Sequence, residues 1–335
     1  MEIIEKNQTL VMFFIIKGIS DAPELQLIIF FLVLLIYLLT IGGNMMILFL
    51  VCLDPKLHTP MYFFLANLSV LDMFSTTVTL HNILIIFITG NNRISYESCI
   101  CQMYFSGFLI CDEFLFLTAM SYDRYVAICN PLRYHMVVNR RLCIVLAICC
   151  WLLGMIEMIP YMILLLGITC YKSNVINHFF CDLVPLMILS CSDTSTLEIL
   201  SLTEGLLLLT LTPFILKFIS YLFIISTILK IQSSTGRRKA FCTCSSHLTV
   251  VILLYSILLF QYLTPTSLDT SKSNKFFSLF NTAAIPILNP LIYSLKNKDV
   301  KSAMIRTFRY INSYPRSTRD LLNCNMEKCI GQFQK

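Results

Sequence analysis

The run Leu25–Leu53, LQLIIFFLVLLIYLLTIGGNMMILFLVCL, contains no charged residue. A helix of roughly 20 apolar residues crosses a hydrocarbon core of about 30 Å, so this run is long enough to span a membrane. The whole chain of 335 residues shares its character: 57% are hydrophobic and 13% are charged, against roughly 25% charged in a soluble domain. This composition excludes an ordinary soluble protein, and its wealth of aliphatic residues excludes intrinsic disorder.

Six further apolar runs follow the first, and the chain has only 10 glycines and no alternating strand pattern, which disfavours a membrane barrel. The seven runs lie near 25–51, 60–86, 98–123, 142–166, 197–229, 240–263 and 276–295. They predict an all-α membrane protein, a seven-transmembrane helix bundle forming one domain over 1–310. Val300, Met304 and Phe308 recur at four-residue spacing and predict a short C-terminal amphipathic helix over 297–310, followed by a tail, 311–335.

The basic residues are distributed unevenly between the two sides of the predicted bundle. The loops on the side of the C-terminus carry 14 Lys and Arg, and the loops on the side of the N-terminus carry 6. Since the richer side is normally cytoplasmic, we expect residues 1–24 outside and the C-terminus inside. A basic face beside anionic lipid also accounts for the net charge of +6, so nucleic acid is not expected as a partner.

Two kinds of modification are expected on the outer side. Asn7-Gln8-Thr9 is a sequon for N-glycosylation in the outer N-terminal segment. Of the 15 cysteines, four fall in outward segments where disulfides persist, and four cysteines permit three pairings. The four are Cys99, Cys170, Cys181 and Cys191.

Four local motifs resemble those of one family. They are LHTPMYFFLANLS at 57–69, MSYDRYVAIC at 120–129, KAFCTCSSHL at 239–248 and PILNPLIYSL at 286–295. Together they resemble the vertebrate olfactory receptors, which are rhodopsin-like G-protein-coupled receptors, and the resemblance covers about 20–310. It implies a plasma-membrane receptor in which an odorant stabilises a state that activates a stimulatory G protein and raises cyclic AMP.

Two alternatives belong to other classes. A non-olfactory rhodopsin-like receptor would share the Asp-Arg-Tyr and Asn-Pro-x-x-Tyr segments but not the strings at 57–69 and 239–248. A small-molecule transporter should show internal repeats or paired broken helices, and the sequence shows neither. An enzyme is not expected, because there is no metal-ligand spacing, nucleophile elbow or phosphate loop.

The resemblance also assigns roles to residues near the inner ends of the spans. Arg124 would pair with Asp123 at rest and turn toward the G protein when the helices rearrange. Pro290 removes a backbone hydrogen bond and is a plausible hinge. The residues implied in activation and G-protein coupling are Asp123, Arg124, Tyr125, Tyr221, Asn289, Pro290 and Tyr293.

Two acids should reach a similar depth near mid-membrane. Asp72 lies 12 residues into the second span and Glu113 lies 10 residues from the inner end of the third, about 18 and 15 Å at 1.5 Å per residue. Buried acids must be protonated, paired or bound to a cation. Asn44 and Asn289 could supply further ligands. The resemblance implies a resting sodium site, the one cofactor expected; the alternative is a hydrogen-bonded pair of protonated acids.

Lys217 falls in the inner half of the fifth span, where an unpaired lysine costs a few kcal/mol on insertion scales. It either snorkels to the interface or faces the bundle.

The outer half of the bundle should hold the ligand. The resemblance implies a Cys99–Cys181 bridge that pins the long outer loop over the pocket, with Cys170–Cys191 as a second bridge. Cavities between bundle helices suit small apolar ligands. The residues expected at that depth are Ser106, Gly107, Ile110, Cys111, Leu202, Gly205, Leu206, Leu209, Tyr255, Leu258, Leu259, Tyr262 and Thr282.

Overall fold

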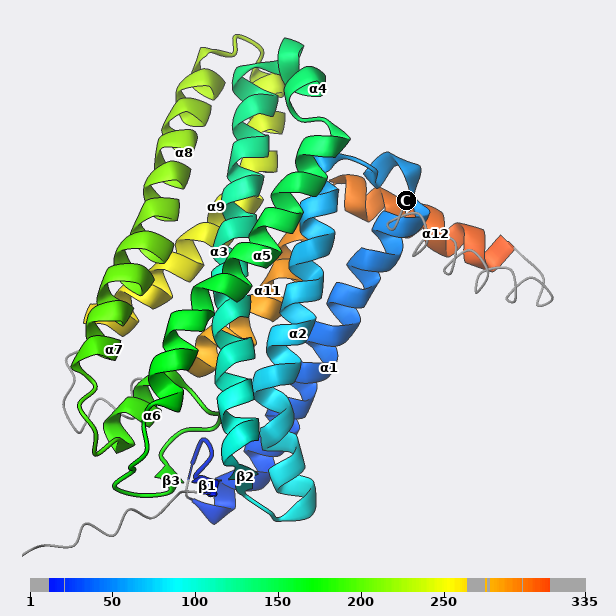
Figure 1. Cartoon of the computed structure of the whole chain (residues 1–335). Coiled ribbons are helices and arrows are strands. Elements are labelled where there is room, and N and C mark those ends of the chain that lie inside the picture. Colours follow the sequence, from blue (N-terminus) through cyan, green and yellow to red (C-terminus); the bar gives the residue numbers. More distant parts are fainter. Residues whose placement is uncertain (1–11, 21, 264–274, 276–277, 297, 314–335) are drawn as a thin grey trace, which may run out of the picture.

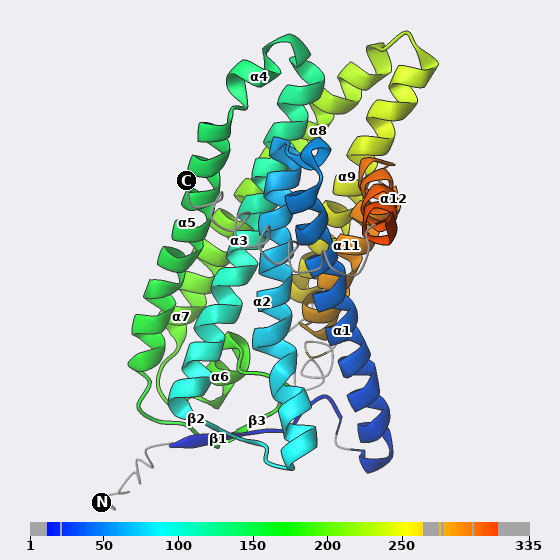
Figure 2. The same cartoon turned by 90° about the vertical axis from the view of Figure 1, so that its right-hand side faces the viewer.

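Long helices run side by side through the whole length of the molecule in the computed structural model (Figures 1 and 2), which describes residues 12–20, 22–263, 275, 278–296 and 298–313. The long helices are α1 Pro23–Leu53, α2 Pro60–Thr89, α3 Tyr96–Cys129, α5 Arg140–Leu166, α8 Thr212–Lys230 and α9 Ser234–Leu263. The shorter ones are α4 Tyr134–Val137, α6 Leu183–Leu189, α7 Ser195–Leu200, α11 Ile285–Lys296 and α12 Lys298–Ser313. Two π-helical segments, Ser201–Leu211 and Phe280–Ala284, lead into α8 and α11.

The helices coincide with the runs read from the sequence. Within the described part of the chain, α1, α2, α3, α5 and α8 are long and apolar enough to cross a membrane. The fifth predicted span extends from α7 through α8, and α9 and α11 cover the remaining two predicted spans. Pro23 and Pro60 stand in the first turns of α1 and α2, where a proline costs no hydrogen bond, and Gly90 ends α2 with φ of +67°.

A small sheet closes one end of the bundle. It contains β1 Phe13–Ile16, β2 Arg93–Ser95 and β3 Val175–Ile176, in the order β2-β1-β3. The pairing of β1 is antiparallel with β2 and parallel with β3. We call this end of the bundle the sheet end, and the opposite end, where α4 lies, the α4 end (Figure 1).

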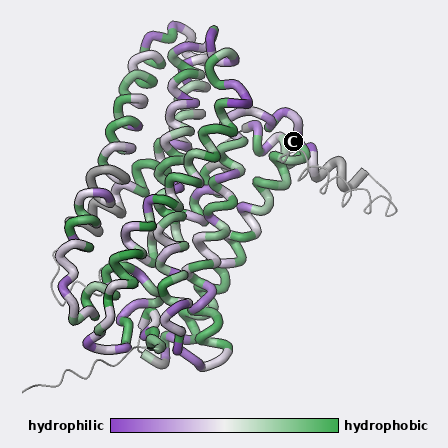
Figure 3. Tube along the Cα trace, in the orientation of Figure 1, coloured by the Kyte–Doolittle hydropathy of each residue, from purple (hydrophilic) through white to green (hydrophobic). Residues whose placement is uncertain are grey.

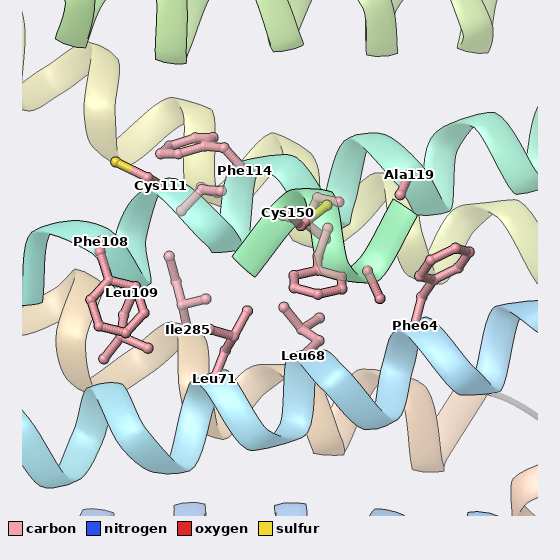
Figure 4. Packing of buried hydrophobic residues seen from close by; sticks show 14 of the residues in the cluster. Phe64, Leu68, Leu71, Phe108, Leu109, Cys111, Phe114, Ala119, Cys150 and Ile285 are labelled. Atoms are coloured by element: carbon pink, nitrogen blue, oxygen red, sulfur yellow. The ribbon is translucent and has the colours of Figure 1, made fainter. Parts of the chain in front are cut away.

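The core is apolar, and so is much of the outer surface. Figure 4 shows Leu68 and Leu71 of α2 pointing toward α3, where Leu109 belongs to the same buried cluster. Hydrophobic residues predominate along the helices, and hydrophilic residues gather at both ends (Figure 3). Large apolar side chains such as Ile156 and Phe218 are more than half exposed. A helix that is apolar on all sides suits a lipid environment.

The amphipathic helix predicted over 297–310 corresponds to α12, which lies across the long helices (Figures 1 and 2). Val300 is buried and Lys301 is exposed, as an interfacial helix requires. The sequon at Asn7 lies outside the described residues, as does most of the tail predicted over 311–335.

Candidate functional site

Two acids share a small cavity in the middle of the bundle. Asp72 of α2 is only 3% exposed, and Asn289 Nδ2 of α11 donates to its two carboxylate oxygens at 3.1 and 3.0 Å. The cavity has a volume of about 10 Å³, room for one water-sized sphere. It is lined by Leu71, Asp72, Ser75, Leu109, Ile110, Glu113, Thr282 and Pro286.

The cavity offers a carboxylate oxygen without a hydrogen-bond partner, which is what a hard monovalent cation requires. Oε1 of Glu113, in the lining, is buried and has no partner. Oδ1 of Asn289, which belongs to the side chain that binds Asp72, is likewise buried without one. Ser75 adds a hydroxyl to the lining that the sequence reasoning missed, although it lies one helical turn beyond Asp72. Asp72, Glu113 and Ser75 would hold the cation, so the residues present fit a sodium ion.

Asn44 lies beside the cavity and does not line it. Its Nδ2 donates to the carbonyls of Thr40 and Pro286 at 3.0 and 3.1 Å. The second bond joins α1 to α11 next to the acids. Asn44 therefore stabilises a wall of the cavity, while Asn289 contacts an acid directly.

Lys217 faces the bundle, which settles the choice left open by the sequence. The side chain comes from α8, is only 1% exposed and donates to the Phe114 carbonyl at 3.0 Å and to the Tyr255 hydroxyl at 3.1 Å. Its Nζ also lies 5.4 Å from the ring centroid of Phe114 and 5.0 Å from that of Tyr255. Cation–π attraction and two hydrogen bonds offset part of the cost of burying the charge.

A second constellation occupies the α4 end. Arg124 Nε and Nη2 donate to Asp123 Oδ2 at 3.0 and 2.7 Å, and the Tyr134 hydroxyl donates to Asp123 Oδ1 at 2.7 Å. The carboxylate is thus satisfied on both oxygens and holds the guanidinium. Burial of Tyr134, reinforced by the Asp123 carboxylate, raises the pKa of its phenol, so the phenol remains a hydrogen-bond donor.

The other residues expected in activation lie on neighbouring helices. The Tyr221 hydroxyl of α8 is hydrogen-bonded to His247 Nδ1 of α9. The ring of Tyr125 packs against that of Phe223 of α8, with the two ring centroids 6.0 Å apart. Pro290 lies inside α11, where it is buried against α1. The side chain of Tyr293 lies outside the described part of the structure.

The residues expected to line the ligand site divide into three groups. Ser106, Cys111 and Thr282 are buried, and Ile110, Gly205 and Tyr255 are partly buried. Leu202 is 56% exposed. Gly107 lies directly against Met158 of α5, so closely that a Cβ atom at this position would clash with the methionine side chain. The side chains outside the described part are Leu206, Leu209, Leu258, Leu259 and Tyr262.

One disulfide ties the long loop between α5 and α7 to α3 at the sheet end, and a second closes that loop on itself. The structure joins Cys99 to Cys181 and Cys170 to Cys191, the pairings implied by the resemblance. Gln102 of α3 adds a contact that the sequence did not reveal, since its Oε1 accepts from the backbone N–H of Cys181 at 3.0 Å. The long loop is therefore fixed across this end by covalent and polar contacts.

Comparison with known proteins identifies the family. The family model described as olfactory receptor matches residues 33–310, most of the chain. The chain belongs to the olfactory receptor family.

The chain aligns with related olfactory receptors over nearly their whole length. The chain is 45% identical to olfactory receptor 6C3 of Homo sapiens over 89% of this chain and 95% of the relative. It is 46% identical to human olfactory receptor 2AP1 over 88% and 96%, and 43% identical to olfactory receptor 5G9 of Mus musculus over 90% and 96%. The protein is thus a multi-pass membrane receptor for odorants and not an enzyme. G-protein coupling with cyclic AMP as messenger is the general mechanism of this family.

Proposed function

We propose that this odorant receptor lies in the plasma membrane with its sheet end outside and its α4 end in the cytoplasm. The disulfides are at the sheet end, which requires an oxidising compartment. Cys129, Cys143 and Cys244, toward the other end, are free thiols. The loops at the α4 end also carry the larger share of Lys and Arg, and anionic lipid would attract them.

The ligand we propose is a small, mostly apolar odorant bound in the half of the bundle nearer the sheet end. Most of the candidate side chains there are aliphatic, which favours burial of apolar ligand surface. Tyr255 and Thr282 supply hydroxyls that could orient one polar group. The site would lie against α9 and α11, so that an occupant can favour one arrangement of these helices over another.

The resting switch supports coupling to a stimulatory G protein. The observation that carries the proposal is the Arg124–Asp123 pair, closed by Tyr134 at the basic end of an olfactory receptor. An odorant that favours a different arrangement of α8 and α9 would release Arg124 toward a G protein at this face. Because a ligand shifts an equilibrium only by its differential affinity, the odorant must bind the released state more tightly.

We further propose that the cavity between Asp72 and Glu113 holds a sodium ion at rest. A bound cation supplies the positive charge that two nearby carboxylates need in a low-dielectric environment. Thermal unfolding of the purified receptor should shift upward with sodium at constant ionic strength, against a bulky organic cation. Asp72→Asn and Glu113→Gln should abolish the shift. A parent protein without sodium dependence would leave protonated, hydrogen-bonded acids as the better account.

An odorant panel tests the whole proposal. Cells carrying the receptor, a cyclic AMP reporter and a stimulatory olfactory-type G protein should respond to at least one small apolar odorant. An N-terminal epitope should be stained on intact cells, and a C-terminal epitope only after permeabilisation. The reverse staining pattern would overturn the orientation, and a response that persists without the stimulatory G protein would overturn the coupling.

A further inference from the structure

Lys217 is a cation in a place where a membrane protein rarely has one. Its side chain is almost completely buried between α3, α8 and α9. A lysine ammonium has three N–H donors, and the Phe114 carbonyl and the Tyr255 hydroxyl use two of them. Both acceptors are neutral. Within the described residues, no carboxylate lies within ion-pair distance of Lys217.

The acid cavity is a source of compensating charge. Glu113, which lines it, directly precedes Phe114, whose carbonyl receives the ammonium. Oε1 of Glu113 is buried without a hydrogen-bond partner. A spare N–H on one side and a spare carboxylate oxygen on the other are complementary. In this low-dielectric interior their attraction is much stronger than it would be in water.

Charge balance gives the pair a specific consequence. Asp72 and Glu113 bring two negative charges when ionised, and Asn289 is a neutral partner of Asp72. With one charge offset by Lys217, the cavity needs only one monovalent cation to become neutral. We propose that Lys217 is the counter-ion of Glu113 and that it limits the cavity to a single, weakly held monovalent cation. The limit on cation affinity rests on the proposed sodium site, whereas the charge pair between Lys217 and Glu113 does not depend on it.

The same side chain links the cavity to α9. Tyr255, which accepts a hydrogen bond from Lys217, is also one of the residues expected at the ligand site. Phe114 and Tyr255 pack their rings 5.5 Å apart beside the ammonium. A further titratable group of α9 is His247, which is buried and whose Nδ1 is hydrogen-bonded to Tyr221. A displacement of α9 therefore changes the contacts of the charge that balances the cavity.

A sodium titration tests the counter-ion role. The Lys217→Met variant keeps an unbranched side chain but lacks the charge. In the purified variant, the sodium concentration that gives half of the thermal stabilisation should fall by roughly tenfold or more, because sodium binds more tightly. Lys217→Arg should restore a midpoint close to the parent value. Lys230→Met is the matched control, since Lys230 is exposed at the end of the same helix, and it should change nothing. An unchanged midpoint in Lys217→Met would overturn the limit on cation affinity.

A double-mutant cycle in sodium-free buffer tests the charge pair independently. Lys217→Met leaves Glu113 without its counter-ion, so adding Glu113→Gln should recover part of the lost thermal stability. If Lys217→Met alone does not reach the membrane, recovery of surface delivery in the double variant is the expected result. Additive losses, or no recovery, would overturn the pair. If the cycle shows coupling but neither parent nor Lys217→Met responds to sodium, the ion site fails while the charge pair stands.

Discussion

The two ends of the bundle are held by different kinds of bond. At the sheet end, two disulfides and a three-stranded sheet fix the long loop between α5 and α7. At the α4 end, reversible contacts do the same work: Asp123 binds Arg124 and Tyr134, and Asp54 binds Arg306. A covalent end keeps its geometry in every state of the receptor, whereas an end held by ion pairs and hydrogen bonds can rearrange. The difference places the moving part of the molecule at the α4 end.

The contributions of a disulfide and of an ion pair to stability differ in size in the same direction. The Cys99–Cys181 bridge closes a loop with a sequence separation of 82 residues, and such a crosslink stabilises by about 4.5 kcal/mol in the chain-entropy account. A partly exposed ion pair contributes at most about 1 kcal/mol. A disulfide does not open thermally, whereas ion pairs and hydrogen bonds such as those at the α4 end break and re-form.

Loss of the long-range disulfide should have the largest effect. Cys99→Ser and Cys181→Ser should each lose surface delivery and response, because either change frees the long loop between α5 and α7 from α3. The double variant should be no worse than either single one, since both remove the same bond. Surface staining and the cyclic AMP reporter measure the two effects.

The second bridge provides the matched comparison. Cys170–Cys191 spans only 21 residues, so Cys170→Ser should cost about 1 kcal/mol less than Cys99→Ser in the chain-entropy account. A free thiol at Cys99 or Cys181 in folded receptor, found by non-reducing peptide mapping, would contradict the pairing and with it the account of a fixed sheet end.

Arg124→Ala should affect signalling without affecting delivery, the opposite pattern to the cysteine variants. The contacts it removes are reversible, and Asp123 keeps the hydrogen bond from Tyr134, so the folded receptor should still reach the surface. The odorant response should fall to background, because the residue assigned to G-protein contact is gone. Full signalling by this variant would reject the switch and erase the functional difference between the ends.

The sequence predicts positions along the helices better than it predicts which way their residues face. Depth along the helices suggests both Asn44 and Asn289 as polar partners of the acids; in the structure Asn289 donates to Asp72, whereas Asn44 donates to backbone carbonyls. Leu202 was expected at the ligand site but is exposed, because a helix that is apolar on every side gives no sign of its rotation. Lys217 had two possible orientations for the same reason. Only the packed structure, with Tyr255 and Phe114 around the ammonium, distinguishes them.

Contacts made by loops were also beyond the reach of sequence patterns. Tyr134 follows α3 closely, yet nothing in its local pattern indicates that it donates to Asp123. The strand β1 pairs with β2 and β3, two segments that are distant in sequence and only two or three residues long. Runs this short carry no usable periodicity, so their pairing depends on how the bundle brings the loops together.

Mild acid should weaken the sheet end selectively. Burial, aided by the nearby Lys275 ammonium, lowers the pKa of His178 from its usual 6.5 to about 3. Between these values the unfolded chain binds a proton that the folded loop does not, so stability falls as pH drops below about 6.5. His178→Phe should lack this loss, about 2 kcal/mol between pH 7 and pH 5.

Burial raises the pKa of Asp182, so this group contributes to the pH dependence of stability with the opposite sign. The contribution is present in both proteins and cancels when the parent is compared with His178→Phe. The measurement is thermal unfolding of purified receptor at several pH values. Parallel pH profiles for the parent and His178→Phe would show that His178 is not the group that senses acid at this end.

The smallest effect is expected at the ion pair between Asp54 and Arg306. Partial burial alone would raise the pKa of Asp54, but the Arg306 guanidinium and the Lys56 backbone amide outweigh it and hold the pKa below its usual 3.8. Stability from this depressed pKa is present above about pH 4 and is lost as the pH falls further, well below the window of His178.

Asp54→Asn isolates the ion pair, because the amide oxygen can still accept the Lys56 N–H that Asp54 Oδ1 now accepts at 3.0 Å. It should cost less than about 1 kcal/mol at neutral pH, since the Arg306 side chain is 41% exposed. Arg306→Gln should cost the same, and the double variant no more than either. The coupling should also shrink in 1 M salt, where the screening length is about 3 Å. A larger, salt-resistant coupling would show that α12 is fixed to the turn after α1 as firmly as the sheet end is fixed by its disulfides, and the contrast between the two ends would then be limited to the contacts of Asp123.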